Sequence, residues 1–149
     1  MGNAFTLIDA VCDAYDNSAW WPDAVPGGPF ETYCNRAVAY VAEAMGYKGF
    51  PADVLANDLI RFMDGSTDWE RVPMAQAQAL ANRGGLVIAA EPAQPHGHVC
   101  VVRPGNAAHS GKWQKAAPKV MNLGKTRDIA KGVNFAFQAE PTFYRWRQE

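Results

Sequence analysis

The hydrophobic pattern of this chain changes its period at the Gly84-Gly85 pair. Before this pair, apolar residues recur at steps of three and four, which is typical of amphipathic helices. After it, short segments rich in valine and aromatic residues are separated by Gly, Pro and Asn turns, which is typical of strands. Helices followed by strands predict an α+β fold, in which N-terminal helices pack on one side of a C-terminal antiparallel β-sheet.

We expect helices over residues 3–16, 32–45, 53–64 and 73–83, and strands over 86–90, 99–102, 119–123, 133–137 and 142–147. Between the first two helices, residues 17–31 contain three prolines and the adjacent pair Trp20-Trp21. This composition predicts an ordered loop. Its two tryptophans either cover the core or line a cleft.

The chain has 149 residues and a formal net charge of −1, so we expect a single domain over residues 1–149. Lys and Arg form no basic block of the kind that attracts nucleic acid. No apolar run approaches the roughly 20 residues that a membrane-spanning helix needs. The opening stretch MGNAFTLIDAVCDAYD lacks a basic n-region, which predicts synthesis in the cytoplasm without a signal peptide.

The three cysteines, Cys12, Cys34 and Cys100, have unrelated spacings and form no CxxC pair, which argues against a disulfide framework or a zinc ladder. Cys12 lies on the apolar stripe of the first helix, as a buried and unreactive thiol would. Cys34 falls in the first turn of the second helix, where unpaired N–H groups lower a thiol pKa. It is therefore either a nucleophile or a small packing residue. Cys100 lies in mid-strand, where burial raises a thiol pKa.

His98 begins a predicted strand, and strand alternation places it on one face with Cys100 and Val102. From there it can act as the base for Cys34, in a thiolate–imidazolium pair. His96 lies in the preceding Pro/Gly loop and is less well fixed. These two histidines lack a convincing third metal ligand, because His109 falls in a turn, so we expect no metal.

Asn122 is the candidate for a third group that orients the imidazole through its second ring nitrogen. It closes the predicted strand 119–123, which should lie beside the strand of His98. A buried amide there needs a hydrogen-bond partner, and an imidazole N–H would supply one. Alternatively, Asn122 simply begins the turn before Gly124.

Three short motifs, TYCNRAVAYV, GGLVIAA and HGHVCVV, follow one another in the order cysteine helix, strand, histidine strand. This order resembles the NlpC-type and CHAP-type cell-wall hydrolases of the papain-like superfamily, over about residues 30–125. The resemblance implies a papain-like fold with Cys34 as nucleophile, His98 as base and Asn122 as orienting residue, and no cofactor. Gly85 stands where these families commonly have Asp.

The resemblance further implies that the substrate is an amide bond in a peptidoglycan stem peptide. Trp20, Trp21, Tyr33 and Trp113 are then candidates for the cleft rim, because aromatic rings cover peptide backbones and sugar faces. An enzyme of this kind would reach the periplasm or cell wall as a phage lysin or as a secreted antibacterial effector. An effector would have an immunity protein as partner.

Two other functions fit the same residues. A papain-like acyltransferase or deamidase would use the same Cys34–His98 dyad on another acyl group. A non-catalytic module would recognise a glycan or a protein through the sheet and the Trp-rich loop, and Cys34 would then be a packing residue.

Overall fold

The computed structural model describes residues 34–51, 54–94, 97–123 and 127–147. Three α-helices are present in this part of the chain: α2 (Cys34–Ala44), α3 (Ala56–Gly65) and α4 (Met74–Asn82). A 3-10 helix, η2, covers Val133–Phe135. The strands are β1 (Trp69–Val72), β2 (Val87–Glu91), β3 (His98–Val102), β4 (Ala108–Ser110), β5 (Lys115–Ala117), β6 (Lys119–Leu123), β7 (Arg127–Gly132) and β8 (Thr142–Trp146).

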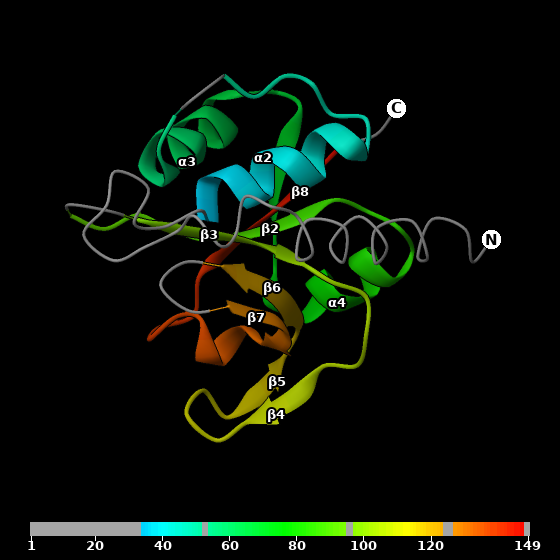
Figure 1. The fold of residues 1–149 in the computed structure, drawn as a ribbon. Helices are drawn as coiled ribbons and strands as arrows, with labels where there is room; N and C mark the ends of the chain where they lie inside the picture. Colours follow the sequence, from blue (N-terminus) through cyan, green and yellow to red (C-terminus); the bar gives the residue numbers. More distant parts are fainter. Residues whose placement is uncertain (1–33, 52–53, 95–96, 124–126, 148–149) are drawn as a thin grey trace.

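Six strands form one antiparallel sheet in the order β1-β8-β2-β3-β6-β7, and β4 and β5 form a separate hairpin (Figure 1). The central strand β3 pairs with β2 through Ala89 and Cys100 and with β6 through Val101 and Met121. The register between β6 and β7 shifts between Val120 and Asn122. The described chain is thus a mixture of helices and antiparallel sheet, which is compatible with the expected α+β class.

Side chains of the sheet alternate between two apolar cores, one on each face. The first core joins α2 and α3 to Ile88, Val99 and Val101 of the sheet. The second core joins α4 to Ala89, Cys100 and other residues of the opposite face. The expectation that the helices pack on one side of the sheet is therefore wrong. The apolar residues of α4, which include Ala77 and Ala81, cover the second face.

Glycines set the ends of two helices. Gly46 follows α2 with a φ of +104°, a conformation that favours glycine and stops the helix, as its sequence position predicts. Gly84 follows α4 with a φ of +88° and turns the chain into β2. Pro73 precedes α4, where a missing N–H costs nothing because the first turn has no intrahelical acceptor.

The structure differs from the expected elements in several places. Residues 133–137 were predicted as a strand, but the chain forms η2 from Val133 to Phe135. The short strand β1 lies between α3 and α4 and pairs with β8 at the edge of the sheet. The sequence also did not indicate β4, β5 or β7. The helix expected over 3–16 and the loop expected over 17–31 lie outside the described residues.

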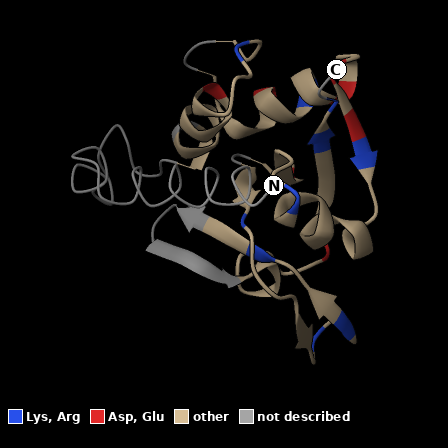
Figure 2. Ribbon diagram, turned by 90° about the vertical axis from the view of Figure 1, so that its right-hand side faces the viewer, with Lys and Arg blue, Asp and Glu red and all other residues tan. Residues whose placement is uncertain are grey.

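Polar side chains tie the helices to the sheet at several points. Asp64 at the end of α3 accepts hydrogen bonds from the Tyr144 hydroxyl at 2.8 Å and from Arg71 Nη2 at 2.7 Å. Positions of both charge signs are spread over the described elements (Figure 2). None of the described helices is both long and apolar enough to cross a membrane.

Candidate functional site

Cys34 is the first residue of α2, and its side chain is 4 % exposed. The helix packs on β3, and Cys34 belongs to the first core together with Val99 and Val101 of that strand. A residue at this position is surrounded by backbone N–H groups that have no acceptor within the helix. The predicted placement of Cys34 in the first turn of a helix is therefore confirmed for the described part of the chain.

His98 is the first residue of β3 and is half-buried. Its ring centroid lies 5.2 Å from that of Phe137, with the two planes tilted by 51°. Phe137, Cys100 and Val102 all belong to the second core, so His98 shares their face of the strand, as predicted. Val99 points to the opposite face, beneath α2. Cys34 thus belongs to the core beneath α2, whereas His98 packs on Phe137 of the core on the opposite face, and the pairing of the two side chains stays a prediction.

The first residues of α2 and β3 lie at the same end of the molecule. In Figure 1, α2 and β3 run in the same general direction and both begin on the left. Packing between the two elements brings Cys34 close enough to Cys100 that its charge contributes to the raised pKa of that thiol. Cys100 lies two residues beyond His98 on the same strand face.

The N-terminal end of α3 bridges these two segments. Beside Cys34, the Asn35 side chain donates a hydrogen bond to the Val54 carbonyl at 2.8 Å. Three residues further along, the Asn57 amide donates to the Ala93 carbonyl at 2.9 Å, and its oxygen accepts the Ala93 N–H at 3.3 Å. Residues 54–57 thus contact both the start of α2 and the loop that leads to β3.

Gly97 is the last residue of this loop before His98, and the backbone there passes close to neighbouring groups. A Cβ added at Gly97 would overlap the Asn57 Oδ1 and would lie 2.8 Å from the Glu91 carbonyl oxygen. Only glycine allows the backbone to pass so close to both groups. Asn57 and Glu91 therefore border the backbone at Gly97, immediately before His98.

Cys100 is almost completely buried in the second core. Burial raises its pKa well above the ordinary value of a thiol, and the charge of Cys34 raises it further. A neutral thiol is a poor nucleophile. Of the two described cysteines, Cys34 therefore has the better position for reaction.

Asn122 lies in β6, whose bounds, Lys119–Leu123, are those predicted from the sequence. β6 pairs with β3, so the expected adjacency of the two strands is confirmed. The backbone of Asn122 is paired on its other side with Asp128 of β7. Its side chain lies outside the described groups, so its contact with the imidazole stays a prediction.

The aromatic residues proposed for the cleft rim are mostly outside the described part: Trp20, Trp21 and Tyr33 all precede α2. Trp113 lies in the turn between β4 and β5, and its indole N–H donates to the Gln138 carbonyl at 3.2 Å. The hairpin lies on the side of the sheet away from α2 (Figure 1). The structure thus gives Trp113 a role in fastening the hairpin, and its contact with a substrate stays a prediction.

The remaining histidines and the other core aromatics have clear positions. His109 is exposed on β4, and His96 lies outside the described residues. Within the described part of the chain, no three His, Cys, Asp or Glu residues gather as metal ligands would. Trp69 and Tyr144 are buried in the first core, whereas Trp146 is half-buried at its edge.

Sequence reasoning did not identify Asn57 as part of this region. The stretch ANDLIRF reads as an ordinary helix start, and nothing local indicates a contact with Ala93. No family model and no curated protein matches this chain.

Proposed function

We propose that the protein is a cysteine hydrolase that cleaves an amide bond in peptidoglycan stem peptides. The observation that carries the proposal is the bridge formed by residues 54–57, which holds the start of α2 and the loop before His98 at one end of the molecule. A nucleophile at a helix start and a histidine at a neighbouring strand start are the parts that this chemistry needs.

In the proposed reaction, the imidazole of His98 takes the proton of Cys34, and the sulfur attacks the amide carbonyl carbon. The carbonyl oxygen becomes an oxyanion, which the backbone N–H groups at the start of α2 stabilise. The imidazolium then gives its proton to the leaving amine, and a thioester remains on Cys34. Water, activated by the same imidazole, hydrolyses the thioester to an acid and restores the thiol.

Asn122 would act on the imidazole from the neighbouring strand β6. An amide oxygen that accepts the second ring N–H keeps the ring in one tautomer and one orientation. The pairing with Cys34 would require the His98 ring, which packs on Phe137, to turn toward α2 at the start of β3. We propose that substrate binding favours this rotamer.

Delivery to the cell wall would follow the routes of phage lysins or secreted effectors, and an effector would be neutralised by an immunity protein. These partners rest only on the resemblance of the motifs. The proposed mechanism depends on Cys34 and His98 and requires none of these partners.

Digestion of purified peptidoglycan tests the proposal, with the products read by mass spectrometry of the muropeptides. The wild-type protein should release fragments with one new amine and one new acid. Cys34→Ala and His98→Ala should abolish their release, whereas Cys100→Ala and His109→Ala, which change the same residue types elsewhere, should not. Activity in Cys34→Ala equal to that of the wild type would end the proposal. A new amide or ester in place of the acid would indicate an acyltransferase.

A further inference from the structure

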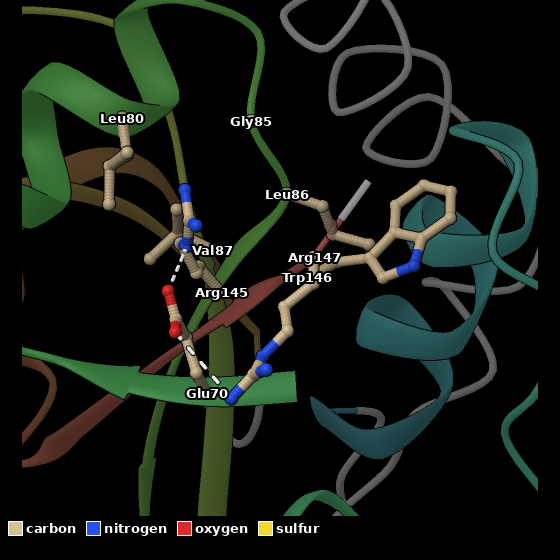
Figure 3. Close-up of a pocket in the computed structure, with 8 residues that line it drawn as sticks. All are labelled: Glu70, Leu80, Gly85, Leu86, Val87, Arg145, Trp146 and Arg147. Carbon is tan, nitrogen blue, oxygen red and sulfur yellow. Dashed lines mark hydrogen bonds and ion pairs between the residues drawn. The ribbon is translucent and has the colours of Figure 1, made fainter. Parts of the chain in front are cut away.

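A cavity of about 280 Å³ lies at the end of the sheet formed by β1, β8 and β2. It shares no residue with the Cys34–His98 site. Its lining is divided into an apolar part and a charged part (Figure 3). The apolar part includes Leu80 of α4 and Val87 of β2, and the charged part consists of Glu70, Arg145 and Arg147.

The pairing of the strands places the charged groups. Arg145 is paired with Val87 on one side and with Glu70 on the other, so Glu70 and Arg145 point to the same face of the sheet. Arg145 Nε donates to Glu70 Oε2 at 2.5 Å, and Arg147 Nη2 lies 3.6 Å from Glu70 Oε1. One carboxylate thus holds two guanidinium groups, one at each oxygen (Figure 3).

This arrangement leaves the cavity with one positive charge more than Glu70 neutralises. A guanidinium has five N–H donors, and the contacts with Glu70 engage only one nitrogen of each arginine among the described residues. In Figure 3, the terminal nitrogens of Arg145 extend toward Leu80, away from Glu70. Donors held in place beside an apolar wall are suited to an anion that carries a short apolar group.

We infer that this cavity binds a small organic anion. Its carboxylate or phosphate group contacts the N–H groups of Arg145 and Arg147 that Glu70 leaves unengaged, and its apolar part packs on Leu80. Glu70 positions the two guanidinium groups before the ligand arrives, which lowers the entropy cost of binding. The site is independent of the proposed hydrolase activity.

Titration of the ¹⁵N-labelled protein with butyrate, acetate and inorganic phosphate tests the inference, with the Nε–H resonances of Arg145 and Arg147 as the readout. Binding should shift these resonances in a saturable way. Butyrate should bind more tightly than acetate by about threefold or more, because its extra methylene groups are buried against Leu80. The comparison of butyrate with phosphate shows which anionic group the arginines prefer.

Arg145→Gln and Arg147→Gln should each weaken binding by about tenfold, the effect of losing a charge-assisted hydrogen bond. Arg147→Gln keeps the backbone hydrogen bond from Arg147 N to the Asp68 carbonyl, so it tests the site without altering the sheet. Arg61→Gln is the matched control, because Arg61 pairs with Asp58 on the exposed face of α3. Absence of a saturable shift at about 50 mM probe, or equal affinity in all three variants, would overturn the inference.

Discussion

Asn57 and Ala93 exchange two hydrogen bonds although they are 36 positions apart in the sequence. A single side chain at the start of α3 therefore satisfies both the N–H and the carbonyl of one residue in the loop between β2 and β3. This loop ends at Gly97, immediately before His98. The geometry of the proposed base thus depends on a residue of another element.

We predict that Asn57→Ala loosens this loop and lowers the free energy of unfolding by about 1 kcal/mol. The loss is modest because Ala93 is exposed, so that water can replace the lost hydrogen bonds. Urea unfolding measures the stability. An NMR titration of His98 reports whether the environment of its ring has changed. Asn106→Ala removes an exposed asparagine elsewhere and should change neither. An identical His98 titration in wild type and Asn57→Ala would contradict the role of Asn57.

Gly97→Ala should have a larger effect, because the new Cβ would overlap both the Asn57 Oδ1 and the Glu91 carbonyl oxygen. We expect a loss of about 1–3 kcal/mol, the usual cost of overpacking. The double variant Asn57→Ala/Gly97→Ala should recover part of this loss, since the side-chain overlap disappears while the overlap with the Glu91 backbone remains.

A matched control for this cycle is Gly111→Ala, because nothing lies within 4 Å of a Cβ built at Gly111. Its free energy of unfolding should stay close to that of the wild type in the same urea titration. If Gly97→Ala were tolerated as well as Gly111→Ala, the close approach at Gly97 would be wrong.

The local sequence pattern was sufficient to predict those elements whose structure is determined by their own residues. Strand β6 was predicted with its bounds, Lys119–Leu123, and α2 ends before Gly46 as expected. Strand β1 escaped prediction because its four residues, WERV, are too few and too polar to show a periodic pattern. It exists because β8 offers an edge with which to pair. Pairing with β8 thus determines the strand conformation of β1, which the local propensity of its residues does not indicate.

In the candidate site, too, local pattern predicts some features, whereas others depend on tertiary contacts. The first turn of α2 and the face that His98 shares with Cys100 follow from helical and strand periods, and both could be read from the sequence. The approach of Asn57 to Ala93 could not, because it depends on how α3 lies across the loop. The covering of the second face by α4 was also missed, since periodicity reveals that a helix has an apolar side but not which face of the sheet that side covers.

The two described cysteines should differ in reactivity. We predict that iodoacetamide at pH 6 modifies Cys34 in the folded protein and leaves Cys100 unmodified, because burial raises the pKa of Cys100, whereas Cys34 lies at the start of a helix, where a thiolate is favoured. Peptide mass spectrometry identifies the labelled thiol. In urea both should react at the same rate at higher pH. Modification of Cys100 before Cys34 in the folded protein would reverse the assignment, and labelling of neither would favour a non-catalytic role.

Tyr144 should make the stability depend on pH in alkaline solution. Burial, followed by its hydrogen bond to Asp64, raises its pKa to about 12. The unfolded chain releases the phenol proton near pH 10, while the folded protein keeps it until about pH 12. The unfolded state therefore binds fewer protons in this window, and the free energy of unfolding falls as the pH rises from about 10 to about 12.

Unfolding in urea at a series of pH values checks this dependence. Tyr144→Phe should be less stable than the wild type at neutral pH, because Asp64 loses a hydrogen-bond donor, and its stability should fall less steeply above pH 10. Equal slopes for the two proteins in that window would mean that Tyr144 titrates normally in the folded state.

Gln78 should be the most sensitive polar residue of α4. Its Nε2 donates to the Arg103 carbonyl at 2.7 Å, and its Oε1 accepts the Lys119 N–H at 2.9 Å, so that one buried side chain joins the helix to β6 and to the segment after β3. Gln78→Ala removes both of these hydrogen bonds from a buried position, which should cost about 2–4 kcal/mol. Gln76→Ala, two residues away on the exposed side of the same helix, should cost almost nothing. Urea unfolding of the pair measures the difference directly, because helix propensity changes equally in both variants. A difference near zero would show that water reaches the Gln78 site and replaces its hydrogen bonds.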